Sequence, residues 1–397
     1  MLITALLACT TFACCFYLVG IGSAFLHLRT RKHSQRSTAL PPITLLKPLK
    51  GLEEDLEGCL RSFFAQQYPG PLEIVFATAT RDDPALAVAR KLAERHPHVR
   101  TRFVLTDANW GLNPKVSNLQ GALRAAHTDL VLQTDANVWA PPTYVRDIVS
   151  ELLRERASLL SSLVTGTGER SFGAAMENLQ LTAYVAPACC TAMVIGGVPC
   201  VIGKSMLFRK SELRALGGLE LVKDSLAEDF LIGQTYADAG KKVLLSATPI
   251  RNVNVDMGVE RSLKRHARWL KMRAVIHPLS FIVDVLANPI ALALALYAAT
   301  GCDALYGWSA LAIVCTKTVI DGLMVRVIRG TSMRARLVLA VPLKDLLMLA
   351  VWLYASVSRS VVWRGVRFRL GPGSQLVPDE GNLPVRVIRR LWSAEGG

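Results

Sequence analysis

Several well-known sequence signatures are missing from this chain of 397 residues. No Gly-x-Gly-x-x-Gly follows the first predicted strand, and no Gly-x-x-x-x-Gly-Lys-Ser/Thr occurs, so a dinucleotide-binding fold or a P-loop ATPase loses its main support. The Gly-x-Ser-x-Gly elbow of serine hydrolases is also missing. The nine cysteines are odd in number and form no Cys-x-x-Cys pair, which argues against a disulfide framework or a zinc site and favours a reducing compartment.

The charge of the chain is concentrated in short blocks. The formal net charge is +15, yet 51% of the residues are hydrophobic and the mean hydropathy is +0.32. This composition excludes a disordered chain and argues against a soluble nucleic-acid binder, so we expect no nucleic-acid partner. Residues 37–250 are neutral, with 22 basic and 22 acidic side chains. The excess lies at 29–36, 251–273 and 320–397, beside apolar runs, as expected for segments that face an anionic cytoplasmic leaflet of a lipid bilayer.

An apolar run at each end of the chain predicts an integral membrane protein. Leu2 to Leu28 is long enough to cross a bilayer, and its basic flank follows it, so we expect an uncleaved anchor with its N-terminus outside. Three further runs follow, Leu279 to Ala299, Ala304 to Val325 and Leu337 to Val357, the first two as a hairpin. The predicted organisation is therefore an anchor (1–28), a basic juxtamembrane linker (29–40), a cytoplasmic domain (41–275), a C-terminal transmembrane region of two to three helices (279–358) and a basic tail (359–397).

Two features of the membrane segments leave alternatives open. A full crossing by Leu337 to Val357 would place the arginines after it outside, against the positive-inside rule, so this run is either a crossing or a re-entrant or interfacial helix. Lys317 and Asp321 are spaced to pair on one helix face, which favours a structural role over a lipid-substrate cavity. Ala183 to Gly203 is uncharged but interrupted by proline and glycine, and we expect a buried or membrane-surface segment that could form the floor for an apolar acceptor.

The central part alternates between short apolar runs and amphipathic stretches. Such alternation predicts βαβ units and a mostly parallel sheet. The predicted strands are 43–46, 72–78, 99–105, 130–134 and 158–164, and the predicted helices are 55–67, 84–96, 114–126 and 142–156.

Carboxylates follow two of these strands. Ligands of open α/β sheets bind outside the carboxyl ends of the strands, which selects Asp82, Asp83 and Asp135. Asp135 and Asn137 form an Asp-x-Asn tripeptide whose oxygens could face Mg²⁺ or Mn²⁺ together with the phosphates of a substrate. An aspartate after a strand is more often only a turn or cap residue.

Two later elements carry further charged groups. Glu228 and Asp229 begin a predicted helix that runs to Ala239, with apolar neighbours. Arg265, Arg268 and Trp269 lie on a basic helix, 262–273, immediately before the membrane hairpin. This helix either rests on lipid headgroups or presents an Arg-Trp pair to a diphosphate.

Taken in order, these motifs resemble the ceramide glucosyltransferase family, membrane-bound inverting GT-A glycosyltransferases related to the family-two glycosyltransferases. The resemblance implies an α/β, Rossmann-like GT-A domain and covers about residues 40–280 closely. The matching segments are Leu46-Lys47-Pro48-Leu49-Lys50-Gly51, Asp82-Asp83-Pro84, Gly111 to Leu119 (GLNPKVSNL), Thr134-Asp135, Ala227-Glu228-Asp229, Arg265-x-x-Arg268-Trp269 and, more loosely, Trp363-Arg364-Gly365.

The resemblance also implies roles for individual residues. Asp229 matches the general base, and Glu228 would orient it or bind the sugar. Arg268 and Trp269 would close over the diphosphate and the acceptor. The remaining predicted contacts are to a UDP-sugar donor or to a divalent metal, Mg²⁺ or Mn²⁺: Asp82, Asp83, Lys115, Asn118, Asp135 and Arg265 for the nucleotide sugar, and Asp135 with Asn137 for the metal. Because the family's acidic tripeptide ends here in Asn137, metal binding would rest mainly on Asp135.

The implied activity is that of a hexosyltransferase that moves glucose from UDP-glucose to the hydroxyl of ceramide, giving glucosylceramide, on the cytoplasmic face of a membrane, the inner membrane in a bacterium. Other readings stay open: a hopanoid-associated or other lipid glycosyltransferase with a different sugar, a processive polysaccharide synthase, or a non-catalytic membrane scaffold or transporter.

Overall fold

A mixed eight-stranded sheet forms the centre of the molecule. The computed structural model describes residues 1–30, 40–363 and 366–378. The strand order is β3-β2-β1-β4-β7-β6-β8-β5, with β1 to β4 and the β6–β8 pair parallel, and β4–β7, β6–β7 and β5–β8 antiparallel. The strands are β1 (Ile43–Pro48), β2 (Leu72–Thr78), β3 (Arg100–Leu105), β4 (Leu130–Thr134), β5 (Val138–Trp139), β6 (Leu159–Thr167), β7 (Ser205–Arg209) and β8 (Val243–Val253). The predicted α/β class and mostly parallel sheet are confirmed, while β7 and β8 were not predicted.

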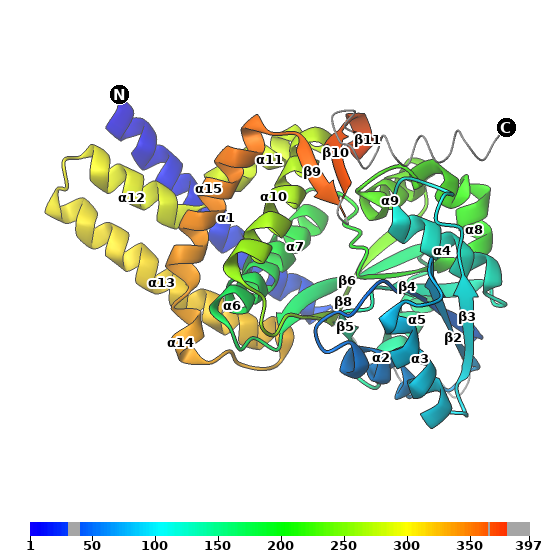
Figure 1. Ribbon diagram of the computed structural model, residues 1–397. Helices are drawn as coiled ribbons and strands as arrows, with labels where there is room; N and C mark the ends of the chain where they lie inside the picture. The colour runs from blue at the N-terminus through cyan, green and yellow to red at the C-terminus, as the bar shows by residue number, and fades with distance from the viewer. Residues whose placement is uncertain (31–39, 364–365, 379–397) are drawn as a thin grey trace.

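Helices cover both faces of this sheet (Figure 1). The alternation of buried residues shows the two faces in β2, where Ile74 and Phe76 belong to one core cluster and Val75 and Ala77 to the other. Each such fully buried large side chain contributes about 1.5–3 kcal/mol of hydrophobic stabilisation. The helices of this part, which we call the sheet domain, are α2 (Leu56–Phe64), α3 (Pro84–Arg95), α4 (Pro114–Ala125), α5 (Tyr144–Arg154), α8 (Lys210–Ala215), the 3-10 helix η2 (Gly218–Val222) and α9 (Glu228–Asp238).

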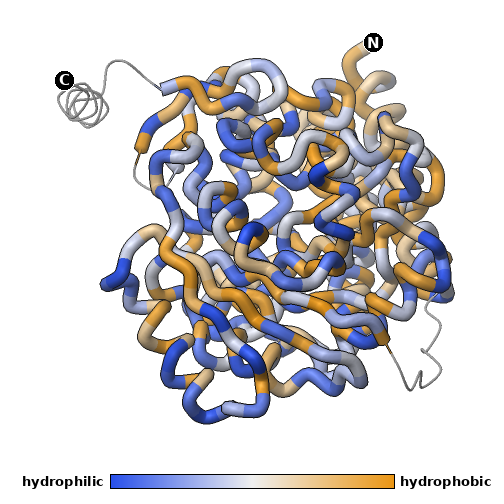
Figure 2. Tube along the Cα trace, turned by 90° about the vertical axis from the view of Figure 1, so that its right-hand side faces the viewer, coloured by the Kyte–Doolittle hydropathy of each residue, from blue (hydrophilic) through white to orange (hydrophobic). Residues whose placement is uncertain are grey.

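A helical region extends from the sheet domain on one side (Figure 1), and hydrophobic residues dominate its N-terminal helix (Figure 2). Two helices of the described residues, Leu2–Arg29 and Ala335–Val357, have the length and composition of a membrane span, and a bent pair, Pro278–Leu286 with Pro289–Ala299, could make a third. The elements are α1 (Leu2–Arg29), α6 (Phe172–Leu179), the π-helix η1 (Gln180–Val185), α7 (Ala186–Val194), α10 (Val259–Ile276), α11 (Pro278–Leu286), α12 (Pro289–Ala299), α13 (Ala304–Arg329), α14 (Ala335–Val338) and α15 (Val341–Val357).

The predicted run Leu279 to Ala299 is broken into α11 and α12, with a bend of 58°. Pro289 cannot donate a backbone hydrogen bond inside a helix, and Asn288 caps α12 by accepting a bond from the backbone N–H of Ala291. Lys317 and Asp321 do pair, with Nζ and Oδ2 2.6 Å apart, and Asp345 of α15 lies 3.1 Å from the same ammonium. This buried contact joins α13 to α15.

Residues before and after the α14–α15 segment form hydrogen bonds with other parts of the protein. Before it, Arg329 at the end of α13 donates to Glu169, which follows β6. After it, Lys271 of α10 donates to Ser358 Oγ at 3.0 Å and to the carbonyl of Ser360 at 2.8 Å. This segment packs along the basic helix α10, and it also has the length and composition of a membrane span.

Part of the predicted basic tail forms a second, three-stranded antiparallel sheet. It consists of β9 (Ser360–Trp363), β10 (Val366–Leu370) and β11 (Leu376–Pro378), with a 3-10 turn, η3 (Pro372–Ser374), before β11. Arg367 and Arg369 face outward while Phe368 and Leu370 pack on Leu226, so strand periodicity separates the arginines from a small apolar core. Residues 379–397 of the predicted tail, like 31–39 of the predicted linker, lie outside the described residues.

Candidate active site

The strand pairing brings an aspartate and a lysine face to face at the carboxyl end of β4. In the antiparallel β4–β7 pair, Thr134 lies opposite Ser205. The next residue after Thr134 is Asp135, and the residue before Ser205 is Lys204. Their side chains meet, with Lys204 Nζ 3.0 Å from Asp135 Oδ2 and 2.8 Å from Asn137 Oδ1. The backbone register therefore determines this contact.

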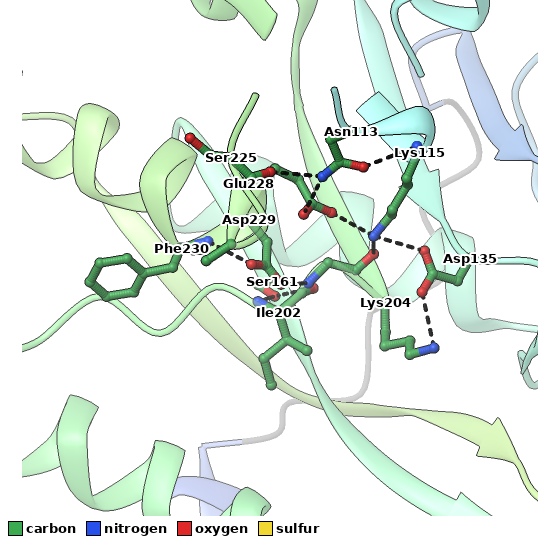
Figure 3. A network of polar contacts seen from close by, with 12 residues as sticks. Asn113, Lys115, Asp135, Ser161, Ile202, Lys204, Ser225, Glu228, Asp229 and Phe230 are labelled. Atoms are coloured by element: carbon green, nitrogen blue, oxygen red, sulfur yellow. Dashed lines mark hydrogen bonds and ion pairs between the residues drawn. The ribbon is translucent and has the colours of Figure 1, made fainter. Parts of the chain in front are cut away.

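Lys115 connects Asp135 to the acid pair. Asn113 caps α4 by accepting from the backbone N–H of Lys115, which places the lysine in the first turn. Lys115 Nζ lies 3.0 Å from Asp135 Oδ1 and 2.7 Å from Glu228 Oε1 (Figure 3). The structure thus brings together Lys115, Asp135 and Glu228, which lie far apart in the sequence.

The charges in this network shift one another's proton affinities. Burial alone would raise the pKa of Asp135, but Lys115 and Lys204 outweigh it and lower this pKa below its usual range. Burial likewise opposes the charge on Lys115, yet Asp135, Glu228 and Asp229 raise its pKa above the usual lysine value. Burial raises the pKa of Glu228 despite the attraction of Lys115. Burial also lowers the pKa of Lys204, against the attraction of Asp135.

Asp229 lies beside these groups and is held by backbone amides. Its Oδ2 accepts a bond from the N–H of Gly203 at 2.6 Å, and its Oδ1 accepts from the N–H of Phe230 at 2.8 Å (Figure 3). The chain passes close to both side chains at Gly203, because a Cβ there would lie 2.9 Å from Lys115 Nζ and 3.0 Å from Asp229 Oδ2. The carboxylate of Asp229 is partly exposed and has a fixed orientation.

We define the strand-edge cluster as Lys47, Lys115, Asp135, Lys204, Glu228 and Asp229. Two of these residues, Lys47 and Lys204, were not among the site residues predicted from the sequence. Lys47 is fully buried, and its ammonium donates to the carbonyl of Asp135 at 3.1 Å and lies 3.3 Å from the ring centroid of Phe63. Lys47 belongs to a quoted motif, which was a usable signal. For Lys204 and Gly203 the sequence offered none, because their partners are set by the β4–β7 register.

The predicted metal ligands are occupied by ammonium groups. Both carboxylate oxygens of Asp135 and the amide oxygen of Asn137 contact Lys115 or Lys204. Over residues 1–30, 40–363 and 366–378, no group of three or more His, Cys, Asp or Glu side chains is placed to hold a metal ion. Mg²⁺ is bound by oxygens at about 2.0–2.1 Å, and this arrangement does not offer such a shell. The residues as placed do not fit a divalent metal.

Other predicted nucleotide contacts have structural partners. Asp83 is buried, caps α3 through the N–H of Ala85 at 2.9 Å, and accepts from the N–H of Gly51, which joins two of the quoted motifs. Its neighbour Asp82 is exposed. Asn118 is buried and bridges Thr106 Oγ1, at 2.6 Å, and the carbonyl of Leu49, at 3.1 Å.

The residues of the basic helix α10 form a separate group around Glu177 of α6. We call Glu177, Ser262, Arg265 and His266 the helix cluster. Arg265 Nη1 lies 2.9 Å from Glu177 Oε1, while Ser262 donates to Oε2 and His266 Nε2 lies 2.9 Å from that oxygen. Burial alone would raise the pKa of Glu177, but His266, Arg265 and Ser262 lower it below its usual range.

Arg268 and Trp269 have aromatic contacts in another part of the molecule. Arg268 Cζ lies 4.4 Å from the ring centroid of Trp363 in β9, and Trp269 makes an edge contact with His266. An open cavity of about 650 Å³ between β5, β6 and β8, with Trp139, Arg170 and Arg251 in its walls, is lined by none of the predicted site residues.

Comparison with known proteins identifies the class. The model of glycosyl transferase family 21 matches residues 10–376, and the chain belongs to this family of glycosyltransferases. The fold resembles a mannosyltransferase from Pyrobaculum calidifontis solved with GDP-Man and Mn²⁺ (TM-score 0.50, 18% identity, 88% of this chain and 99% of that one), which supports the GT-A architecture.

The curated relatives share one activity in their names. Ceramide glucosyltransferase 1 of Caenorhabditis elegans is 28% identical over 280 residues, 69% of this chain and 59% of the relative. Ceramide glucosyltransferase 3 of the same organism is 25% identical over 93% of this chain and 82% of its own length. A ceramide glucosyltransferase of Komagataella phaffii is 30% identical, with 46% of this chain and 41% of the relative covered. The predicted membership of a membrane glycosyltransferase family is confirmed.

Proposed function

We propose that this protein is a ceramide glucosyltransferase that moves glucose from UDP-glucose to the primary hydroxyl of ceramide. The observation that carries the proposal is the strand-edge cluster, in which a carboxylate with fixed orientation, Asp229, lies beside ammonium groups able to receive a diphosphate. The family and the names of the relatives favour the same sugar and lipid.

The chemistry follows from the positions of these groups. The acceptor hydroxyl oxygen attacks the anomeric carbon of the sugar while Asp229 takes the hydroxyl proton. The bond between that carbon and the β-phosphate oxygen breaks, and UDP leaves with the electron pair. Glu228, held by Lys115, would bind the sugar or orient Asp229. Lysines of the cluster would contact the negatively charged diphosphate of the donor. No step is assigned to a metal, because its predicted ligands, Asp135 and Asn137, contact lysine side chains.

Further residues keep the roles that we expect from the family. Asp82 and Asp83 would lie near the uridine, and Asn118 near the phosphates or sugar. Arg268 and Trp269 would close over the diphosphate and the acceptor. Arg265, which the family resemblance places at the nucleotide sugar, is paired with Glu177 in this structure.

The segment expected to receive the apolar acceptor lies close in the chain to the residue that bonds Asp229. Ala186 and Cys190 of α7 pack against α1 and α13, so this helix lies between the sheet domain and the membrane segments. The chain then exposes Val194 and Ile195 before it reaches Gly203, which bonds Asp229. The predicted floor for a lipid thus leads into the catalytic loop.

We also propose that the sheet domain faces the cytoplasm, at the inner membrane in a bacterium. The hairpin turn between α12 and α13 carries the exposed Cys302, whereas Cys59 is buried and cannot report on the sheet domain. In intact cells, a membrane-impermeant thiol reagent should label Cys302 and leave an introduced Glu94→Cys unlabelled. Labelling of Glu94→Cys in intact cells would reverse the assignment.

The activity is tested with purified full-length protein. Release of UDP should require both a UDP-sugar and ceramide, should be fastest with UDP-glucose, and should produce glucosylceramide identified by mass spectrometry. Turnover with another sugar or with a polycyclic lipid would keep the glycosyltransferase and replace the substrate. No UDP release with any donor would contradict the proposal.

A further inference from the structure

Lys204 lies where a bound cation would be expected. Its ammonium contacts Asp135 Oδ2 at 3.0 Å and Asn137 Oδ1 at 2.8 Å, the two side chains of the Asp-x-Asn tripeptide. The other carboxylate oxygen of Asp135 contacts a second ammonium, that of Lys115. Every side-chain oxygen expected to hold a metal therefore already has a cationic partner from this chain.

The backbone fixes the position of Lys204. Thr134 and Ser205 are partners in the β4–β7 pair. Asp135, which follows Thr134, and Lys204, which precedes Ser205, therefore lie opposite each other. On the other side, the N–H of Gly203 donates to Asp229, and its carbonyl lies 3.5 Å from Lys115 Nζ. The lysine is thus joined through its neighbour to the proposed general base.

The surroundings disfavour an additional divalent ion. Two ammonium groups, of Lys115 and Lys204, contact the carboxylate of Asp135, and they would repel a further cation. To provide an oxygen shell, the tripeptide would have to release Lys204. The same positive groups are suited to oxygens of a diphosphate, for which lysine is a common point-charge ligand.

We propose that Lys204, held by Asp135 and Asn137, is the cation that contacts the donor diphosphate in the role a divalent metal would otherwise have. The proposal rests on the proposed function and adds the group that stabilises the leaving UDP. When the bond between the anomeric carbon and the phosphate oxygen breaks, the electron pair remains on that oxygen and the ammonium lies beside it. Asp135 and Asn137 act as positioning residues for this lysine.

The test compares chelator and metal on the full-length protein in detergent. Wild-type turnover, measured as UDP release with UDP-glucose and ceramide, should change less than about twofold between EDTA and Mn²⁺. Lys204→Met should lose about 100-fold in turnover in EDTA, the typical effect of removing one group that stabilises charge in the transition state. Its affinity for UDP, measured by calorimetry, should fall about tenfold.

Two matched variants separate this role from a structural one. Lys241→Ala removes an exposed lysine of the sheet domain and should leave turnover unchanged. Lys204→Arg keeps a cation and should retain more turnover and UDP affinity than Lys204→Met. The two variants should have the same midpoint of thermal unfolding.

Opposite results overturn the proposal. Wild-type turnover and UDP binding that vanish in EDTA and return with Mn²⁺ would show that a metal holds this place, while the glycosyltransferase assignment would stand. Wild-type turnover in Lys204→Met would contradict it as well. If no donor and acceptor gave turnover, UDP binding in EDTA by wild type and Lys204→Met would still decide the role of Lys204.

Discussion

The strand-edge cluster and the helix cluster use the same residue types in different ways. In the strand-edge cluster, lysines contact carboxylates of different exposure: the side chain of Asp135 is 21% exposed, while that of Glu228 is buried. In the helix cluster, one carboxylate, Glu177, is fully buried, with each oxygen in contact with partners. The strand-edge cluster combines three lysines with three carboxylates, and a ligand can reach its accessible members, whereas the partners of Glu177 enclose its carboxylate completely. This difference supports the proposal that the first cluster carries the chemistry, while the second attaches α10 to α6.

The strongest test of this contrast is Asp229→Asn. We expect turnover to fall by about 10³-fold, within the usual range for loss of a general base. UDP affinity and thermal stability should stay close to wild type, because the amide keeps the shape of the side chain. Loss of folding or of UDP binding would instead make Asp229 structural. The assays are UDP release, calorimetry and thermal unfolding.

Glu177→Gln should lower the stability of the folded protein, whereas Asp229→Asn should lower turnover. Removing one partner of a buried ion pair leaves Arg265 without its compensating charge, which destabilises by about 3–5 kcal/mol. The loss should appear as a lower midpoint of thermal unfolding. If Glu177 instead served catalysis directly, turnover would fall without a change in that midpoint.

The same residue predicts a pH dependence. Because the folded-state pKa of Glu177 is lowered, its contribution to stability is present above the ordinary glutamate pKa of about 4.3 and is lost as the pH falls. The stability difference between wild type and Glu177→Gln should therefore shrink as the pH is lowered below about 5. A constant difference would mean that the carboxylate charge is not the source.

A smaller effect is expected at Gly203. The added methyl group of Gly203→Ala would lie 2.9 Å from Lys115 Nζ and displace this flexible side chain from Asp135 and Glu228. Turnover should fall by roughly 10- to 100-fold, since small misplacements of catalytic groups are costly, with little change in thermal stability. Gly218, whose added Cβ would meet no atom within 4 Å, is unsuitable as a control because its φ is +69°. Gly258, equally open and without positive φ, provides the control as Gly258→Ala.

The smallest effect is expected in the C-terminal sheet. Ser374 Oγ accepts a bond from the N–H of Ala227, and its carbonyl accepts from Leu226, directly before the acid pair. Ser374→Ala should weaken this support by about 1 kcal/mol, the usual net value of one hydrogen bond, and lower turnover several-fold. Membrane insertion and the helix cluster should be unaffected. Unchanged kcat in the folded variant would show that Ser374 does not position Glu228 and Asp229.

Much of the fold could be predicted from the sequence, because helices and strands are indicated by patterns of residues that are close together in the chain. The proline after the capping residue correctly indicated the start of α3 and of α4. The acid pair Glu228 and Asp229 begins a helix, α9, as predicted. The β7 and β8 strands escaped prediction because their pairing partners are distant in the chain. The strands of the C-terminal sheet pair with their neighbours in the chain, so this sheet was missed for a different reason. The basic residues after residue 359 include the outward-facing arginines of β10. The buried residues that alternate with them in this strand were not recognised from the sequence.

What the sequence determined by itself was the class of protein: an apolar, basic chain with alternating elements and ordered motifs that resemble a membrane glycosyltransferase family. The tertiary structure alone decided which charged residues meet. Lys204 faces Asp135 because antiparallel pairing places them opposite each other, and Arg265 faces Glu177 because α10 packs on α6. Motif order records residue types along the chain, but the contacts that make one cluster reactive and another structural depend on strand register and helix packing, which are properties of the folded molecule.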